Sequence, residues 1–353
     1  MTMQNFALTP GRINKFKGQL LAHAVPQECL SRAGRQVSFP KNNSDTYVAR
    51  RWLPYGATAS SPNTFFGTTA AVDRGQALVQ AHQTAEGVTS PPDNMVPQDV
   101  TVVLQQYNVL YGFTDKTYDL YEDDIPVEAI KQVGERVTLV SEMINFGVLK
   151  SCTNVFYGGT GTSRATVNGK ITLPLVRKIS AGLMANHGKM VTSVLKPSAM
   201  YGTDAVAGGF LVYCHTDLEP DIRDMPGFIP AEKYASGTPM ANELGKVERF
   251  RFITSPEFVS IFDGGAAVGA TGLRSAAGSN IDVYSFIVMA EDAWSQVAVR
   301  GLGALDPTYL PPGRKDKSDP QGQRGYIGTK WWKAAMVENN GWMAVAHVGV
   351  TAL

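Results

Sequence analysis

The sequence predicts an α+β fold, because one long helical pattern stands between segments that have the residue pattern of β-strands. From Pro126 to Lys150, apolar residues recur at steps of three or four, which is the spacing of one helix face. Residues 36–53 and 100–113 precede it, and both have strand character: the first is interrupted, and the second is rich in β-branched and aromatic residues. At about 1.5 Å per residue, the helix would extend roughly 37 Å.

Both charge and proline position support a helix that starts near residue 126. Pro126 suits the first helical position, where its missing N–H is not needed. Asp123, Asp124 and Glu128 place negative charge where the helix dipole favours it. No catalytic pattern lies on this helix, so we interpret it as structural support.

The two strand segments before the helix predict a hairpin that projects from the body. Residues 54–97 between them are rich in Pro, Gly, Ser, Thr and Asn, with a short helix expected at 76–83. A strand over residues 36–53 would reach about 60 Å. A compact chain of 353 residues has a radius of gyration of only about 20 Å. A projecting hairpin needs a partner to cover it, since exposed strand edges invite pairing.

The rest of the chain predicts a second helix and a mixed α/β lobe. The helix is expected at residues 173–195, and the lobe at 205–306. Strands are expected within the lobe at 209–214, 247–253 and 283–289. Near the C-terminus, Asn339-Asn340-Gly341 separates two apolar segments, a pattern typical of a tight hairpin turn.

Bulk properties exclude several classes of protein. A length of 353 residues predicts two or more lobes, and a net charge of +1 argues against a protein whose main task is to neutralise phosphates. The three cysteines are far apart and odd in number, which predicts no disulfide framework. We find neither a signal-peptide pattern nor an apolar run of about 18 residues, so we expect a soluble cytosolic product without a membrane partner.

Charge is distributed unevenly along the chain. Residues 1–51 carry eight basic and two acidic side chains, a net charge of +6. The charged side chains of residues 115–135 are mostly acidic. One interpretation is a set of solvated faces. The other is that a basic arm meets an acidic surface on a second copy. A nucleic-acid interface is weakly supported, because the dispersed cations lack interleaved aromatic residues.

The sequence predicts no catalytic, cofactor or metal site. The five histidines lack metal-ligand spacing, and His215 with Asp217 is interpreted as an exposed pair. Residues 159–164 resemble a phosphate loop but lack its lysine. Asp115, Asp119, Asp123 and Asp124 lack the glycine and closing glutamate of a calcium loop, and we interpret them as a solvated surface. An enzyme is therefore not expected, and a hydrolase with a concealed site is the most distant alternative.

An ordered series of short motifs carries a family resemblance over roughly residues 35–350. The series contains Arg50-Arg51, residues 85–89 (AEGVT), 105–107 (QQY), 113–115 (FTD), the long helix, 212–224, 243–253 and 328–332. In this order it resembles the major capsid proteins of tailed bacteriophages, specifically a podophage-type coat-protein family. Three features depart from the family pattern: Thr216 in place of a proline, Arg249 in place of a glycine, and a longer segment at 56–85.

The resemblance implies the Hong Kong 97-type (Johnson) fold, with five parts. These are an N-terminal arm (1–35), an extended loop formed by a long β-hairpin (36–105), a peripheral domain (106–185) with its spine helix at 126–150, an axial domain (186–319), and a C-terminal β-hairpin that returns to the peripheral domain (320–353).

The function implied by the resemblance is structural. Copies of the chain would form hexamers and pentamers of an icosahedral head shell around packaged double-stranded DNA, with portal, scaffold or decoration proteins as further partners and no cofactor. Such a protein assembles in the host bacterial cytoplasm and resides in the virion capsid. An encapsulin-type compartment shell of the same fold is the alternative. We expect the interface between copies to include Arg50, Arg51, Glu86, Asp119, Asp123 and Asp124.

Overall fold

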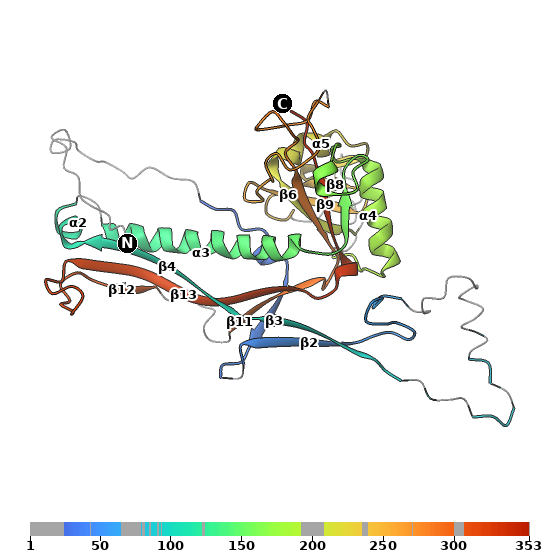
Figure 1. Ribbon diagram of the computed structural model, residues 1–353, viewed down its shortest axis with the longest axis horizontal. Helices are drawn as coiled ribbons and strands as arrows, with labels where there is room; N and C mark the ends of the chain where they lie inside the picture. The colour runs from blue at the N-terminus through green and yellow to red at the C-terminus, as the bar shows by residue number, and fades with distance from the viewer. Residues whose placement is uncertain are drawn as a thin grey trace.

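The protein is an elongated α+β molecule, which confirms the predicted fold class. A computed structural model describes residues 25–42, 44–64, 94–121, 124–191, 208–234, 239–269, 271–299 and 307–352, with a few positions between 79 and 92. Figure 1 shows a long flat region, in which α3 lies along β4 and β13, and a rounded lobe at one end of it. A two-stranded ribbon, β2 with β3, extends below the junction of these parts.

The predicted long helix is confirmed as α3, Ile125–Lys150. The side chain of Asp124 caps it by accepting a hydrogen bond from the backbone N–H of Val127, and Pro126 occupies its first turn. Lys150 lies in the last turn, where the helix dipole favours a cation.

The flat region is a five-stranded sheet covered on one face by α3. Its order is β1 (Arg35–Phe39), β11 (Trp294–Val299), β13 (Arg324–Val337) and β12 (Thr308–Leu310), and β4 (Gln105–Thr114) pairs with the other edge of β13. Val133 and Val137 of α3 pack against Val109, Ile327 and Trp331 of β4 and β13. This burial of an apolar helix stripe on a sheet accounts for the straight course of α3.

The rounded lobe is built on a seven-stranded mixed sheet. Its order is β5 (Val155–Tyr157), β14 (Met343–Val348), β10 (Tyr284–Met289), β6 (Phe210–His215), β9 (Phe250–Ser255), β8 (Glu243–Val247) and β7 (Phe228–Pro230). On one face it packs against α4 (Leu173–Ala185) and α5 (Glu219–Arg223). On the other face it receives Phe146 and Leu149, so α3 connects the cores of the two sheets.

The remaining elements are short. They are α2 (Asp115–Leu120) and the 3-10 helices η2 (Leu30–Arg32), η3 (Arg164–Thr166), η4 (Thr216–Leu218), η5 (Ala231–Lys233) and η6 (Asn340–Trp342).

The predicted C-terminal hairpin is wrong, because its two segments belong to different sheets. β13 lies in the five-stranded sheet, and β14 lies in the seven-stranded sheet between β5 and β10. All six residues of β14 are buried, so this strand is stabilised by neighbours on both sides rather than by a hairpin partner. In place of a tight turn, Asn339 caps η6 by accepting a hydrogen bond from the N–H of Gly341.

The predicted long hairpin strands are each divided in two. Residues 36–53 form β1, which pairs in parallel with β11, and β2 (Thr46–Trp52), which pairs with β3 (Pro97–Val103) in a separate two-stranded sheet. Residues 100–113 divide at Leu104, whose side chain is buried beside Phe39 and Val297. The ribbon is therefore shorter than the sequence predicts, because the body retains part of each strand.

Two other elements are shorter than predicted. The second helix ends at Ala185 rather than residue 195, and His187 has a positive φ of 58° just beyond its C-cap. Residues 247–253 contain a turn at Glu248, with φ of 49°, so they belong to two antiparallel strands. The strands predicted at 209–214 and 283–289 are confirmed as β6 and β10. The short helix predicted at 76–83 lies largely outside the described residues.

His347 on β14 makes stability depend on pH. Burial, together with the nearby cations Lys150 and Arg164, lowers its pKa from 6.5 to about 4. A hydrogen bond joins its Nδ1 to the Ser285 hydroxyl, and its ring stacks on Tyr157. The unfolded chain binds this proton more readily than the folded chain, so stability falls as the pH decreases from 6.5 towards 4.

We expect the free energy of unfolding to decrease less in His347→Asn than in wild type when the pH is lowered from 7 to 4.5. Asparagine places a polar atom near Nδ1 but does not titrate, so the contribution of His347 to the pH dependence disappears. Urea unfolding at both pH values measures the difference. Equal losses in the two proteins would show that His347 is not a source of the acid sensitivity.

Candidate assembly surfaces

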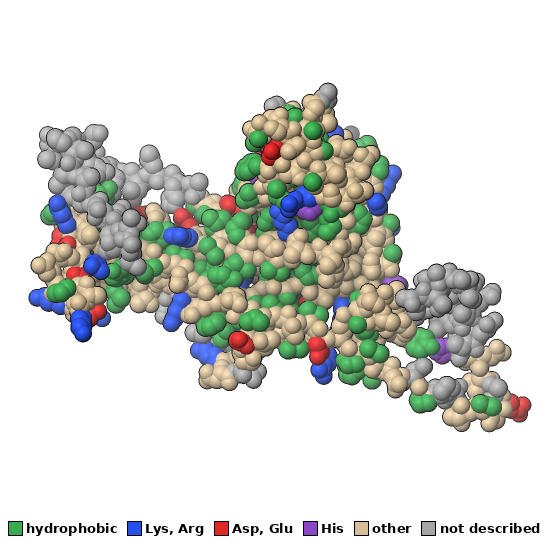
Figure 2. Space-filling view, viewed as in Figure 1, with side chains coloured by type: hydrophobic (Ala, Val, Ile, Leu, Met, Phe, Trp, Pro, Cys, Tyr) green, Lys and Arg blue, Asp and Glu red, His purple; other side chains and the backbone are tan. Residues whose placement is uncertain are grey.

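The ribbon formed by β2 and β3 presents an apolar face to solvent. Val48, Trp52 and Val103 are 48%, 59% and 47% exposed, and strand alternation places all three side chains on one face. Figure 2 shows hydrophobic side chains along this projecting region. A two-stranded ribbon is only marginally stable by itself. An exposed apolar face on such a ribbon is typical of a surface that another chain covers.

Arg50 and Arg51 lie on opposite faces of this ribbon. On the exposed face, Arg50 binds Asp99 on the neighbouring strand through Nε–Oδ1 and Nη2–Oδ2 contacts of 2.7 and 2.9 Å. This hydrogen bonding raises the pKa of Arg50 and lowers the pKa of Asp99. Arg51 points to the other face and donates to the Gln98 side-chain oxygen, and burial lowers its pKa.

Several exposed apolar side chains, together called the distal patch, lie at the far end of the flat region, on both faces of its sheet. The patch comprises the exposed side chains of Leu110, Tyr118, Leu120, Val127, Ile130, Tyr309 and Leu310 from β4, α2, α3 and β12. Exposed clusters of this kind commonly mark protein interfaces. The sequence patterns did not single out this patch, because its residues come from four separate segments.

Two of the four acidic residues expected at an interface, Asp119 and Asp124, are placed at this same end. Asp119 is exposed on α2, and the carboxylate of Asp124 already caps α3. Asp123 lies outside the described residues, and Glu86 is exposed in the segment beyond the ribbon. Figure 1 shows α2 at the left end of the flat region and the ribbon well away from it, below the junction with the rounded lobe. The predicted basic and acidic residues are therefore not brought together within one chain.

The N-terminal segment is attached to α3 by a buried carboxylate that sequence analysis missed. Glu142 is 1% exposed, and its side chain accepts hydrogen bonds from the N–H groups of Cys29, Leu30 and Ser31 and from the Ser31 hydroxyl. The contact to Leu30 is 2.5 Å, and the others are 2.9 to 3.1 Å. A carboxylate satisfies several N–H groups at once, which fixes η2 on the helix.

Neighbouring polar groups complete this attachment. Asn145 donates to the Ser31 hydroxyl and to the Gln296 side-chain oxygen, and Gln296 donates to the Ser31 carbonyl. Lys333 donates to the Ser141 carbonyl, and burial lowers its pKa to about 8 although Glu142 opposes the shift. The signal in the sequence was a carboxylate four residues before Phe146, on the buried stripe of the helix.

The buried charges of the rounded lobe are paired internally. Arg251 makes two 2.6 Å contacts with Glu243, and both side chains are almost fully buried. Asp221 accepts from Lys170 and from the backbone and hydroxyl of Thr351. These interactions hold β8, β9 and the C-terminal segment in place, and this structural role accounts for the burial of the charges.

The pair His215 and Asp217 is not exposed as predicted. The side chain of His215 is 17% exposed, and its Nδ1 accepts the backbone N–H of Asp217. The Asp217 carboxylate in turn accepts from Arg274 and from the Tyr284 hydroxyl. A polar network therefore links the end of β6 to β10 and to the loop that carries Arg274.

Metal sites and membrane-spanning helices are two further features that would indicate other functions. Within the described ranges, no three or more His, Cys, Asp and Glu side chains gather in a way that could hold a metal ion. Among those same residues, none of the helices combines the length and apolarity needed to cross a membrane.

Comparison with known proteins places this architecture among viral and related shells. No family model matches the sequence. The major capsid protein of Pseudomonas phage KPP21 is 25% identical over 263 residues, which cover 69% of this chain and 65% of that protein, a little under two thirds of its length. The solved capsid of Ralstonia phage GP4 superposes with a TM-score of 0.64 and 13% identity, over 99% of both chains. The SrpI encapsulin of Synechococcus elongatus PCC 7942 superposes with a TM-score of 0.55 and 10% identity, over 98% of both chains.

These similarities define the fold as that of phage capsid proteins and encapsulins, consistent with the Hong Kong 97 type. The resemblance to the major capsid proteins of tailed phages is thereby confirmed. The same comparisons agree with the location expected from the sequence, the capsid of a virion.

Proposed function

We propose that the chain is a major capsid protein that assembles with copies of itself into a closed shell. The observation that carries this proposal is a capsid-type fold whose projecting ribbon exposes Val48, Trp52 and Val103. The role is structural rather than enzymatic, as for the capsid proteins that the chain resembles.

The proposed contacts are between the ribbon of one copy and the flat region of the next. Arg50 and Arg51 lie on the ribbon, whereas Asp119 and Asp124 lie beside the distal patch. Within one chain the ribbon lies far from α2 and the start of α3 (Figure 1), so any pairing between these groups is intermolecular. Apolar burial would supply most of the association energy, and charge would favour the correct orientation.

The finer organisation follows from the resemblance. We propose that residues 36–105 act as the extended loop, 106–185 as the peripheral domain and 186–319 as the axial domain of hexamers and pentamers. The packaged content would be double-stranded DNA, with portal, scaffold or decoration proteins as further partners. The encapsulin alternative is favoured by one observation, the full-length superposition on SrpI.

Sedimentation of the purified protein tests the proposal. A capsid protein is expected to form particles of megadalton mass, whereas a single chain has a mass of 38.1 kDa. Nuclease-protected DNA inside particles formed in an infected host would favour the phage capsid, and a co-purified enzyme would favour the encapsulin alternative. A persistent monomer at all concentrations and salt conditions would contradict both.

Charge reversal at Asp119 is expected to weaken assembly at low salt. This side chain is exposed on α2 and caps no helix, so Asp119→Lys leaves the folded subunit intact. The defect should shrink at high salt, because exposed charges are screened beyond about 3 Å at 1 M ionic strength. Light-scattering assembly assays on wild type, Asp119→Lys and the neutral control Asp119→Asn give the comparison. Equal assembly of all three would remove Asp119 from the interface.

A further inference from the structure

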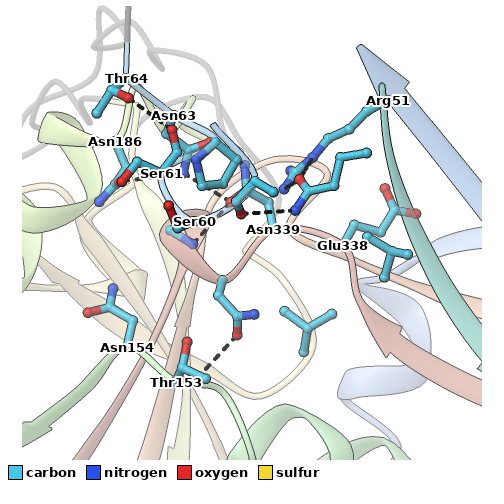
Figure 3. A pocket seen from close by; sticks show the side chains of 17 residues that line it. Arg51, Ser60, Ser61, Asn63, Thr64, Thr153, Asn154, Asn186, Glu338 and Asn339 are labelled. Carbon is cyan, nitrogen blue, oxygen red and sulfur yellow. Dashed lines mark hydrogen bonds between the residues drawn. The ribbon is translucent and has the colours of Figure 1, made fainter. Parts of the chain in front are cut away.

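The segment that follows β2, residues 54–64, turns back from the ribbon towards the body; we call it the return segment. Ala57 N–H donates to the Pro54 carbonyl, and Thr58 and Ser61 pair in a short bridge. On the ribbon side, Gln98 receives two hydrogen bonds from Arg51 and donates to the Ala59 carbonyl at 3.3 Å. Figure 3 shows this region, with Arg51 on one side and Asn63 on the other.

On the body side, Asn63 makes a reciprocal contact with Asn339. The Asn63 amide donates to Asn339 Oδ1 at 3.0 Å, and the Asn339 amide donates back to Asn63 Oδ1 at 2.7 Å. Asn63 Nδ2 also lies 3.3 Å from Asn186 Oδ1. Asn339 is only 2% exposed, so its side chain is held in place to receive this partner.

Gly341 is the position that makes this contact possible. A Cβ atom at Gly341 would lie 2.1 Å from Asn63 Nδ2 and 2.8 Å from Asn186 Oδ1. Its φ is outside the left-handed region, so an alanine is compatible with the backbone itself. Glycine is therefore required here by the approach of Asn63, and not by the turn that the sequence pattern indicated.

The body residues of this contact lie where the two sheets meet. Asn339 and Gly341 belong to the connection between β13 and β14, and Asn186 is the C-cap of α4. The return segment therefore links the ribbon to the junction of the two sheets. A cavity of about 520 Å³ lies between its two attachment points, lined by polar groups that include Thr153 and Asn154 (Figure 3).

We propose that the Asn63–Asn339–Gly341 contact is a positioning contact that sets the direction in which the ribbon leaves the body. This inference rests on the proposed function, in which the ribbon reaches a neighbouring copy. Each hydrogen bond between neutral amides makes only a small net contribution to stability. The contact therefore restricts the ribbon in the free subunit, yet it is weak enough to be exchanged when a neighbour binds.

Distance measurements on the soluble subunit test the proposal. Spin labels at Thr101→Cys on the ribbon and Ala181→Cys on α4 report the ribbon direction, since the three native cysteines are buried. We expect Asn63→Ala and Gly341→Ala each to broaden the distance distribution at least twofold. The double variant should broaden it no further than either single variant, because both changes remove the same contact.

Ser60→Ala is the matched control, because Ser60 lies in the return segment and, among the described residues, its hydroxyl hydrogen-bonds Thr58 of the same segment. An unchanged distribution in Asn63→Ala and Gly341→Ala would overturn the positioning role, as would additive broadening in the double variant. Shell formation by the unlabelled wild type is measured separately by sedimentation. Its failure would contradict the proposed function and leave the distance result unaffected.

Discussion

Replacing Glu142 with alanine is expected to destabilise the subunit by about 3 kcal/mol and to release the N-terminal segment from α3. The substitution leaves the N–H groups of Cys29 and Leu30 without their acceptor in a buried position. Each buried donor left unsatisfied costs roughly 1–3 kcal/mol. Lys333 also loses the nearby charge that opposes the lowering of its pKa.

Two measurements check this expectation. Urea unfolding gives the loss of stability, and hydrogen exchange at residues 29–31 gives the release of the segment, which should accelerate well beyond the global change. Gln132→Ala is the matched control, because Gln132 is exposed on the same helix. A Glu142→Ala protein within 0.5 kcal/mol of wild type, with unchanged exchange, would show that Glu142 does not attach η2 to the helix.

Deleting residues 56–96 is expected to abolish assembly while the subunit stays folded. This segment connects β2 to β3, and none of its described residues belongs to the hydrophobic clusters of the two sheets. Ala57 is the one buried apolar side chain among those described residues. The deletion keeps β2 and β3 but removes most of the proposed extended loop, which lies beyond them. Circular dichroism and urea unfolding should stay close to wild type, and sedimentation should show only small species.

A ribbon variant without the deletion distinguishes the role of the exposed ribbon face from the effect of shortening the chain. Val48→Lys combined with Trp52→Lys keeps the loop but places charge on the exposed face, and it should also prevent assembly. Substituting Lys178→Ala on α4, away from the ribbon, should leave assembly unchanged. Closed shells from the deleted protein would show that residues 36–105 are not the extended loop.

Local sequence patterns predicted the elements whose signal lies within one continuous segment. The apolar spacing of α3 and its capping by Asp124 could be predicted, because both signals are contained in one continuous segment. β6 and β10 could be predicted for the same reason, as short apolar runs buried on both faces.

The errors came from contacts between distant segments. The turn residues Asn339 to Gly341 indicated a hairpin, but the burial of β14 between β5 and β10 determined its position. The glycine serves the approach of Asn63, which lies 276 residues from Asn339. Glu142 was visible only as a charge on an apolar stripe, and its partners at residues 29–31 could not be predicted from local spacing.

A cryo-electron microscopy map of the purified protein under assembly conditions would show whether copies pack through the ribbon. We expect closed shells in which the β2–β3 ribbon lies on the flat region of an adjacent copy, so that this copy covers Val48 and Trp52. Monomers without shells would rule out the proposed assembly, and so would shells in which this ribbon face contacts no other subunit.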